Sequence, residues 1–478
     1  MTEDVGFDQY QSSRRSHWDS VARQTDSWRG WSGAYHARLA EIYRFLIAPG
    51  QRVLEIGCGR GGLLAAVEPR IGVGIDFSLE MVHRAGRRHP DLRFLQADAH
   101  RLPLTGTFDV IILSDLVNDL WDVQRVFEEV RRLSGPSTRV IVNGYSRLWE
   151  LPLDLTERLG LSKPVLHQNW LTVEDTGNLL DLAKLEVIRS WPEILFPLPI
   201  PLVAPVLNRV LVRVWPFRHL GLTNFVVARP VGCLSGGEAR PSVSVVVPAR
   251  NEAGNIAEIF CRLPRMGAET DLIFVEGHSK DDTLEAIQRE IAAQPEQASV
   301  LLRQSGTGKG DAVRVGFAHA SGDVLMILDA DLTVPPETLP RFYEALVSGH
   351  GEFINGVRLV YPMERQAMRI LNLVGNKLFS WAFSWLLGQP IKDTLCGTKV
   401  LWKADYERIA ANRGYFGDFD PFGDFDLLFG AAKQNLKIVD LPVRYRERRY
   451  GTTNIQRWKH GWLLLKMTLF ALWRLKLV

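Results

Sequence analysis

Apolar residues are grouped along this chain in short runs rich in β-branched side chains, and amphipathic stretches separate the runs. A strand that helices cover on both faces has the same continuous apolar pattern. Alternation of such strands with helices favours parallel α/β sheets. The runs lie at residues 52–57, 71–76, 108–114 and 139–144 in the first half, and at 242–248, 271–277 and 323–329 in the second. We therefore predict an α/β protein with two doubly wound domains.

A change in composition marks the boundary between the two predicted domains. Residues 232–241 have the Gly, Ser and Pro content of a flexible linker. A length of 478 residues exceeds that of a typical single core and suits two domains. We predict a first domain at 1–230, a linker at 231–241, a second domain at 242–455 and an amphipathic segment at 456–478.

The overall composition excludes some classes of protein. A hydrophobic content of 46% and a charged content of 23% are those of a soluble globular protein, and a net charge of +3 is too small to predict binding to nucleic acid. The four cysteines, at 58, 233, 261 and 396, lack the paired spacing of zinc or redox sites. The N-terminal residues lack the apolar core of a signal peptide. We therefore expect a cytoplasmic protein.

Glycines and acidic residues gather where the first apolar runs end. The turn after residue 56 has glycines at 57, 59, 61 and 62, which let a backbone approach a nucleotide closely. There, Glu55 could reach a cationic amino group, Asp76 both hydroxyls of a ribose, and Asp98 an adenine amino group. A simpler interpretation stays open, in which Glu55 caps a helix and Asp76 starts a turn.

These motifs resemble those of class I S-adenosylmethionine-dependent methyltransferases, over residues 33–145. The resemblance implies a mainly parallel seven-stranded sheet, with S-adenosylmethionine across the strand ends as the methyl donor. The cofactor-binding residues that it implies are Glu55, Gly57, Gly59, Gly61, Asp76, Phe77, Asp98, Ala99 and Ser114. Asp115, Asn118 and Asp119 are candidates on the side of the methyl acceptor, although acidic residues there are equally typical of a helix cap.

In the second half, polar residues again follow the apolar runs, at the ends where parallel sheets bind ligands. Lys309 opens a stretch whose helix N-terminus could face a phosphate. Asp329 and Asp331 follow a buried run, and two converging carboxylates there can hold Mg²⁺ or Mn²⁺. The residues that we predict to contact a nucleotide sugar are Pro248, Ala249, Asn251, Glu252, Glu276, Ser279, Asp281, Lys309, Asp329 and Ala330.

This set resembles family-2 glycosyltransferases of the GT-A fold, and the downstream motifs resemble the acceptor side of polyprenyl-phosphate sugar transferases. The resemblance implies inversion at the sugar carbon, with Asp393 and Asp424 near the acceptor and that carbon and Arg448 on a phosphate. A phosphate nucleophile needs no strong base, whereas for a hydroxyl acceptor Asp424 is the candidate base. Asp393 as a helix cap and Asp424 in a solvated loop are the alternatives. Glu276-Gly277 departs from the family's consecutive aspartates, so the nucleotide stays open.

Three apolar stretches bear on contact with a membrane. Residues 369–388 have a polar stripe, which predicts an amphipathic helix at an interface. Residues 462–475 are shorter than the roughly 20 needed to cross a bilayer, and residues 195–206 contain four prolines. We expect peripheral attachment to the inner face of the cytoplasmic membrane. Burial of these faces within the protein or in an oligomer is the alternative.

Together the patterns predict a bifunctional transferase of surface-glycan or lipid-linked glycan biosynthesis. It would use a divalent metal to transfer a sugar from a nucleotide sugar to a lipid-phosphate or glycan acceptor, and it would also methylate a related acceptor. Two alternatives stay open: a first domain that is a non-catalytic regulatory module, and a methyltransferase fused to a sugar-binding module. The sequence leaves open the sugar, the nucleotide, the methyl acceptor and the oligomeric state.

Overall fold

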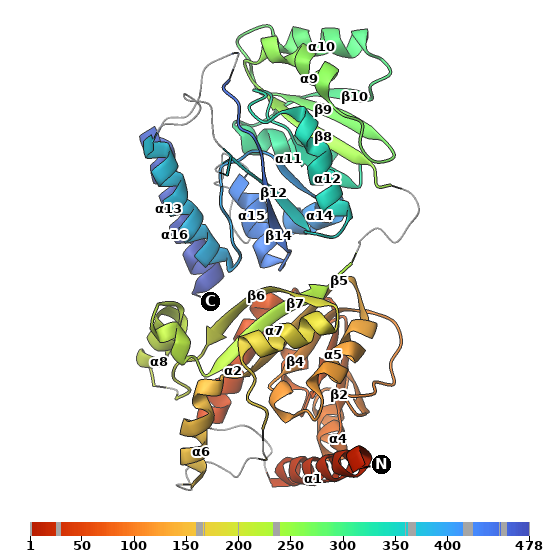
Figure 1. Cartoon of the computed structure of the whole chain (residues 1–478), viewed down its shortest axis with the longest axis vertical. Helices are drawn as coiled ribbons and strands as arrows, with labels where there is room; N and C mark the ends of the chain where they lie inside the picture. The colour runs from red at the N-terminus through yellow and green to blue at the C-terminus, as the bar shows by residue number, and fades with distance from the viewer. Residues whose placement is uncertain are drawn as a thin grey trace. The chain divides into compact units, whose positions relative to one another are not determined.

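The chain folds into two compact units, one formed by Met1–Val231 with Lys476–Val478 and the other by Gly232–Leu475 (Figure 1). This division falls within the segment 231–241 that we predict to be a linker. The computed structural model describes residues 2–24, 30–158, 166, 168–198, 200–232, 240–358, 360–361, 370–413, 424–448, 450 and 457–477.

The N-terminal unit is built on a seven-stranded sheet with the strand order β3-β2-β1-β4-β5-β7-β6. Strands β1 to β5 run parallel, whereas β7 pairs antiparallel with both β5 and β6. The carboxyl ends of the parallel strands therefore meet at one edge. The strands are β1 (Arg52–Ile56), β2 (Ile71–Asp76), β3 (Arg93–Gln96), β4 (Phe108–Ser114), β5 (Ser134–Tyr145), β6 (Leu185–Glu193) and β7 (Thr223–Pro230).

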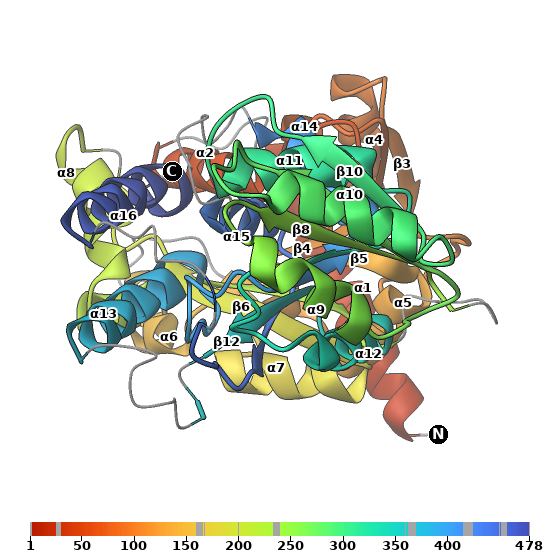
Figure 2. The same cartoon turned by 90° about the horizontal axis from the view of Figure 1, so that it is seen from above.

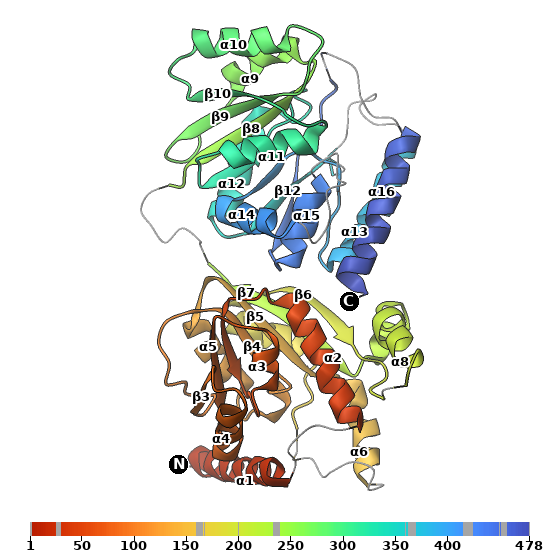
Figure 3. The same ribbon diagram turned by 180° about the vertical axis from the view of Figure 1, so that it is seen from behind.

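Helices cover both faces of this sheet (Figures 1 and 3). Side chains alternate between the faces of a strand. Val53 of β1 accordingly packs with Tyr43 of α2, and its neighbour Leu54 packs on the opposite face with Phe127 of α5. The helices are α1 (Thr2–Gln24), α2 (Gly30–Leu46), α3 (Gly62–Ala66), α4 (Leu79–Arg88), α5 (Val123–Arg132), α6 (Glu150–Arg158), α7 (Val173–Leu182) and α8 (Val203–Pro205).

The C-terminal unit has a second seven-stranded sheet, with the order β10-β9-β8-β11-β13-β12-β14. Strands β10, β9, β8 and β11 run parallel, β13 pairs antiparallel with β11 and β12, and β14 runs parallel to β12. The strands are β8 (Val243–Ala249), β9 (Thr270–Glu276), β10 (Ser299–Arg303), β11 (Val324–Ile327), β12 (Phe353–Val357), β13 (Lys399–Trp402) and β14 (Ile438–Pro442).

The helices of the C-terminal unit also cover both faces of its sheet. Val246 of β8 packs with Phe317 of α11, whereas Val245 and Val247 pack on the other face with Ile259 of α9 and Ile287 of α10. Figure 2 draws α11 and α9 on opposite sides of β8. Among the described helices, none has the length and apolar character needed to cross a membrane. The helices are α9 (Ile256–Arg262), α10 (Thr283–Ala293), α11 (Lys309–His319), α12 (Leu339–Val347), α13 (Ile370–Leu387), α14 (Lys403–Ala411), α15 (Asp424–Lys433) and α16 (Arg457–Ala471).

The packing of α11 on β8 predicts opposite effects for two glycines of this unit. A Cβ atom at Gly316 of α11 would lie 2.4 Å from Cγ1 of Val246, whereas a Cβ at Gly375 of α13 would meet nothing within 4 Å. Gly316→Ala should lower the free energy of unfolding by about 1–3 kcal/mol through overpacking. Gly375→Ala should leave it unchanged or raise it by up to ~1 kcal/mol, because alanine favours a helix. Urea unfolding of the two variants measures both effects, and equal effects would contradict this packing.

Candidate active sites

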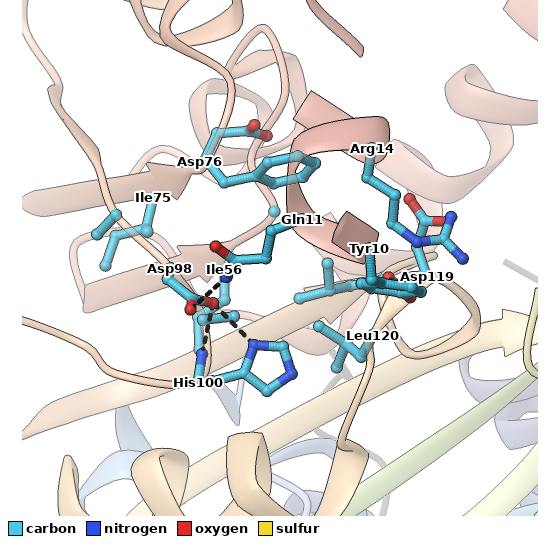
Figure 4. A pocket seen from close by; sticks show the side chains of 15 residues that line it. Tyr10, Gln11, Arg14, Ile56, Ile75, Asp76, Asp98, His100, Asp119 and Leu120 are labelled. Carbon is cyan, nitrogen blue, oxygen red and sulfur yellow. Dashed lines mark hydrogen bonds and ion pairs between the residues drawn. The ribbon is translucent and has the colours of Figure 1, made fainter. Parts of the chain in front are cut away.

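A pocket opens at the carboxyl edge of the N-terminal sheet (Figure 4). It is lined by predicted cofactor-binding residues from three strand ends, namely Gly57, Asp76, Phe77, Asp98 and Ala99. The other four members of the predicted set stand outside the lining: Glu55 in β1, Gly59 and Gly61 in the turn after it, and Ser114 at the end of β4. The sheet therefore brings together at one pocket five of the nine residues that the sequence singled out.

The turn after β1 requires glycine at two positions. Gly57 and Gly61 have left-handed backbones, with φ of +75° and +72°. A Cβ atom at Gly57 would lie 2.8 Å from Cδ1 of Leu116, and one at Gly61 would lie 2.5 Å from Cζ of Phe94. Both the conformation and the lack of space exclude larger residues, so the backbone can run close to the pocket.

Two acidic residues of the pocket have opposite pKa shifts. Asp76 accepts hydrogen bonds from the backbone N of Gly59 and of Ser78, both at 2.9 Å, as the turn-forming interpretation predicted. Burial raises the pKa of Asp76 to about 6. Burial also acts to raise the pKa of Asp98, but contacts from N and Nδ1 of His100, at 3.0 and 2.7 Å, hold that pKa below its ordinary value. The two carboxylates therefore differ in how readily they ionise.

Glu55 is a buried acid whose second carboxylate oxygen lacks a hydrogen-bond partner. The side chain is 3% exposed, and Oε2 has no partner within the described residues. Burial raises the pKa of Glu55 to about 8, although a hydrogen bond from the backbone of Leu64 opposes the shift. The contact with Leu64, in the first turn of α3, agrees with the helix-capping interpretation. The oxygen without a partner is suited to a cationic ligand such as the amino group that we predicted.

Helix α1 covers one side of the pocket, a role that no motif in the sequence predicts (Figure 4). Nε2 of Gln11 donates to Oδ2 of Asp98 at 2.5 Å, and the Tyr10 hydroxyl donates to the backbone O of Asp119 at 2.6 Å. Arg14 forms an ion pair with Asp119. Asp119, a candidate for the acceptor side, therefore anchors this helix. The segment contains no motif, and only its contacts connect it with the site.

Asp115, a candidate on the acceptor side, follows β4 but stands outside the lining of the pocket. Its backbone has a φ of +52° at the end of β4, which is uncommon for a residue with a side chain. Oδ1 accepts hydrogen bonds from the Tyr35 hydroxyl at 2.8 Å and from Nδ2 of Asn143 at 2.6 Å. Burial raises the pKa of Asp115 to about 7, against these two hydrogen bonds. Asn118, in contrast, is used within the fold, where its side chain binds the backbone of Asn169 and Tyr145.

In the C-terminal unit, the loops after β8 and β9 are joined by hydrogen bonds. The backbone N of Asn251 donates to Oγ of Ser279 at 3.1 Å, and the N of Ala253 donates to Oδ2 of Asp281 at 3.3 Å. Oε1 of Glu276 accepts from the N of Ser279 at 2.5 Å. The contacts bring four of the predicted nucleotide-sugar residues to one edge, beside Pro248 and Ala249 at the end of β8. Glu276, the departure from the family pattern, shapes the turn after β9.

Lys309 and Asp329 form an ion pair at the same edge. Nζ of Lys309 lies 2.5 Å from Oδ1 of Asp329. Burial acts to raise the pKa of Asp329, but the charge of Lys309 holds it below its ordinary value, so this carboxylate is ionised. A Cβ atom at Gly397 would lie 2.0 Å from Oδ2 of Asp329 and 2.1 Å from Nζ of Lys309. The absence of a side chain at Gly397 therefore leaves the space that the ion pair occupies.

Arg448 joins two further acids of the predicted site. Its Nη2 lies 2.8 Å from Oδ2 of Asp331, and its Nη1 lies 3.0 Å from Oε1 of Glu252. Burial raises the pKa of Glu252 to about 7, although the charge of Arg448 opposes the shift. The Arg448 guanidinium thus connects the loop after β8 with the segment after β11. Arg448 lies 117 residues after Asp331 in the sequence.

The predicted metal ligands agree with a divalent cation in chemical type. Asp329 and Asp331 supply carboxylate oxygens, which Mg²⁺ and Mn²⁺ prefer. In the described part of the chain, each carboxylate contacts a cationic side chain, and no group of three or more His, Cys, Asp or Glu residues is arranged to hold a metal ion. Metal binding by these two residues stays a prediction.

Comparison with protein families identifies both units. Residues 53–137 match the family model described as a methyltransferase domain, and residues 244–401 match that of glycosyl transferase family 2. The chain joins a methyltransferase domain to a family-2 glycosyltransferase domain. Both resemblances that the motifs suggested are thus confirmed.

Curated relatives match the glycosyltransferase domain. The dolichol-phosphate mannosyltransferase of Pyrococcus furiosus is 38% identical over 232 residues, which are 45% of this chain and 59% of that protein. The undecaprenyl-phosphate 4-deoxy-4-formamido-L-arabinose transferase of Edwardsiella ictaluri is 37% identical over 217 residues, which are 44% of this chain and 61% of that protein. The chain therefore spans about three fifths of the length of these relatives.

Solved structures resemble each domain at low identity. An S-adenosylmethionine-dependent methyltransferase from Mesorhizobium loti is 21% identical, with a TM-score of 0.33, and the match covers 42% of this chain and all of that one. The glucosyl-3-phosphoglycerate synthase of Mycobacterium tuberculosis, solved with Mn²⁺, uridine diphosphate and glucosyl-3-phosphoglycerate, is 19% identical with a TM-score of 0.36, over 49% of this chain and 80% of that one. The assignment of the domains stands on the family models and the strand order.

The acceptor side of the glycosyltransferase domain differs from the expectation at Asp393. This carboxylate is fully buried, and it accepts from Nε and Nη2 of Arg358 at 2.7 and 2.9 Å and from Nδ2 of Asn376 at 3.2 Å. Burial acts to raise the pKa of Asp393, but the charge of Arg358 holds it below its ordinary value. The geometry favours a residue that positions Arg358 over one that touches the substrate. Asp424 begins α15, but its side chain lies outside the described residues.

Glu55 predicts a pH dependence of stability in the methyltransferase domain. Because its pKa rises from 4.5 to about 8 on folding, its contribution to stability is fully present below pH 4.5 and is lost as the pH rises toward 8. Glu55→Gln should therefore reduce the loss of stability between pH 5 and pH 8 by roughly 1 kcal/mol or more.

Hydrogen exchange of peptides from β1, followed at both pH values, measures this effect locally. The matched control is Glu174→Gln, which replaces an exposed carboxylate at the start of α7. An unchanged pH dependence in the Glu55 variant would mean that the buried carboxyl group does not have the raised pKa.

Proposed function

We propose that the glycosyltransferase domain transfers a sugar from a nucleotide sugar to a polyprenyl phosphate. The observation that carries the proposal is the convergence of Asp329, Asp331 and Arg448 at the carboxyl edge of the sheet, next to the loops after β8 and β9. The names of the relatives support a polyprenyl-phosphate acceptor. The loops with Asn251 and Asp281 would hold the nucleoside.

In this proposal the charged residues of the domain have separate roles. Asp329 and Asp331 would bind Mg²⁺ or Mn²⁺, and the metal would neutralise the diphosphate as it leaves. Lys309 and Arg448 supply further positive charge, to the diphosphate and to the acceptor phosphate. An ionised acceptor phosphate attacks the sugar carbon directly, which inverts it in one displacement and requires no proton transfer. For a hydroxyl acceptor, Asp424 would take the proton.

For the methyltransferase domain, we propose binding of S-adenosylmethionine at the pocket of β1, β2 and β3, where the cofactor supplies a methyl group on a sulfonium. The unpaired Oε2 of Glu55 would bind the cationic amino group, Asp76 the ribose hydroxyls and Asp98 the adenine amino group. Asp115, with a pKa of about 7, would accept the proton of a hydroxyl acceptor. The acceptor would be an intermediate of the same glycan assembly.

A second candidate function treats the methyltransferase domain as a regulatory module without catalysis. The contact of Gln11 with Asp98 favours this candidate, because the Gln11 amide donates a hydrogen bond to the carboxylate that the adenine amino group would need. Calorimetry distinguishes the two: a folded domain that does not bind S-adenosylmethionine is a regulatory module.

We further propose that the protein is cytoplasmic and attaches peripherally to the inner face of the cytoplasmic membrane. Apolar side chains on α13 and α16 support this attachment, since Trp381 is 75% exposed and Trp462 is 61% exposed. Aromatic side chains on such helices bind the interface of a bilayer.

The glycosyltransferase proposal predicts the effect of losing one metal-binding carboxylate. Asp331→Asn should lower the rate of sugar transfer to undecaprenyl phosphate by about 100-fold or more, because the charge on the leaving diphosphate is no longer balanced. Chelation of divalent metals should abolish the transfer by the unchanged protein. Product formation from a panel of radiolabelled nucleotide sugars measures both effects.

The matched control for this experiment is Asp282→Asn, which changes an exposed aspartate beside the same loops without touching the ion pairs. Its rate should equal that of the unchanged protein. Full activity of Asp331→Asn, or activity in the presence of a chelator, would contradict the proposed role of the metal.

The methyltransferase proposal predicts a loss of cofactor affinity at Asp76. Asp76→Asn should weaken the binding of S-adenosylmethionine by about 10- to 100-fold, because hydrogen bonds to a charged carboxylate contribute roughly 1.5–3 kcal/mol. Isothermal titration calorimetry measures the affinity. Asp91→Asn, at an exposed position before β3, is the control and should bind as the unchanged protein does. Equal affinity of both variants for S-adenosylmethionine would mean that Asp76 does not bind the ribose.

A further inference from the structure

The connection between β6 and β7 is far longer than its geometry requires. Antiparallel neighbours can be joined by two residues, yet 29 residues, 194–222, separate Glu193 from Thr223 although these two are paired in register. Thr223 also pairs with Tyr145 at the end of β5. The connection therefore projects from the carboxyl edge of the sheet, the edge that holds the cofactor pocket.

The composition of this connection is unusual for an exposed segment. Residues 194–222 include three arginines and one histidine but neither Asp nor Glu. Ten of their large apolar side chains are exposed, among them Leu202 at 85% and Trp215 at 75%. Isolated exposed apolar residues are ordinary, but a cluster of this size marks an interaction surface.

Polar contacts hold the connection in a defined shape. Asn208 joins its two arms, because Oδ1 accepts from the backbone N of Phe196 at 2.8 Å and Nδ2 donates to the backbone O of Phe196 at 2.7 Å. Arg213 forms an ion pair with Glu193 at the end of β6, and Arg209 lies 3.2 Å from Glu41 of α2. Figures 1 and 3 both draw the segment around α8 as a projection next to β6. The apolar side chains are exposed in a folded segment.

A second apolar stripe adjoins the connection. Leu148, Leu151 and Leu155 follow β5 at helical spacing and are 61%, 79% and 57% exposed. Between them, Nε1 of Trp149 donates to the backbone O of Leu220 at 3.0 Å. We call residues 194–198 and 200–222 together with these three leucines the apolar rim. The rim flanks the same edge of the sheet as Asp115, at the end of β4.

We propose that the apolar rim docks the methyltransferase domain onto an anionic lipid surface. The sequence 194–222 contains five prolines, so this segment cannot form a regular helix that crosses a bilayer, and the exposed side chains would lie in the interface of the bilayer. Trp215 and the exposed Arg218 and His219 suit the level of the headgroups. The lack of Asp and Glu in residues 194–222 removes repulsion from anionic lipid on that part of the rim, whereas Glu150 and Asp154 stand among the three leucines.

Docking through the apolar rim also indicates the class of methyl acceptor. Because the rim flanks the catalytic edge, the domain would methylate a glycan or headgroup carried by the lipid surface. This step rests on the proposed methyltransferase function, whereas docking itself does not.

The test places a fluorescent probe on the rim of the full chain. Cys233→Ser and Cys261→Ser would remove one cysteine outside the described residues and one exposed cysteine, leaving the buried Cys58 and Cys396. An environment-sensitive dye is then attached through Leu202→Cys in one protein and through Ser137→Cys in another. Ser137 is an exposed residue near the start of β5, at the opposite edge of the sheet.

On vesicles of phosphatidylglycerol and phosphatidylcholine, the dye at position 202 should shift to the blue and brighten several-fold, and the dye at position 137 should not change. Arg218→Gln should weaken binding to these vesicles about fivefold. If the vesicles carry the protein but the dye at position 202 keeps the emission of a dye in water, the proposal is overturned. Shielding of this dye in the absence of lipid would also overturn the proposal. Shielding that depends on protein concentration would indicate that a second copy of the chain covers the rim, and shielding that does not would indicate another part of the same chain.

Calorimetry with S-adenosylmethionine on the same labelled protein separates the two proposals. Cofactor binding without insertion of the dye contradicts the lipid surface and leaves the proposed methyltransferase function intact. Insertion without cofactor binding supports the docking surface and contradicts the function. A weaker change in dye fluorescence on vesicles of phosphatidylcholine alone would support the requirement for anionic lipid. An equal change on these vesicles would overturn the role of charge in docking.

Discussion

Parallel strands end at the same edge of their sheet, and this constraint positions the polar groups of both domains. In the methyltransferase domain it brings the ends of β1, β2 and β3 to one pocket, which Gly57, Asp76 and Asp98 line. In the glycosyltransferase domain it brings the loops after β8 and β9 to the segment after β11. The hydrogen bonding of the sheet fixes the position of each strand end, so residues that are widely separated in the sequence share a site. The same constraint therefore acts in both sheets.

The two sites differ in how their acids are balanced. In the glycosyltransferase domain, Asp329 and Asp331 contact Lys309 and Arg448, so the site carries its own cations. In the methyltransferase domain, burial raises the pKa of Glu55 to about 8 and that of Asp115 to about 7. Burying a carboxylate without a cation is costly, and a ligand that brings positive charge removes the cost. This contrast agrees with a cationic donor at the first site and an anionic diphosphate at the second.

Half of the pocket-lining residues at the strand ends belong to the set that the sequence pattern predicts, whereas the residues that distant segments contribute do not. Asp76, Asp98 and the glycine turn were found because a buried run, a turn and an acid stand in order along the chain. The role of α1 was missed, because Gln11 and Arg14 belong to no motif and meet the pocket only through tertiary contacts. The ion pair of Asp393 with Arg358 was missed for the same reason, since 35 residues separate the partners. Asp115 was proposed for the acceptor side, but only the structure singles it out from Asn118 and Asp119.

The measurement that tests the central claim most directly is diffraction from crystals of the full chain grown with Mn²⁺, a nucleoside diphosphate and S-adenosylhomocysteine. The account predicts an anomalous peak between the carboxylates of Asp329 and Asp331, together with density for a nucleoside beside Asp76 and Asp98. Separate crystals with uridine and guanosine diphosphate would also identify the base. Carboxylates that remain bound to Lys309 and Arg448 with no anomalous peak, or a cofactor pocket that stays closed by α1, would contradict the presence of two donor sites in one chain.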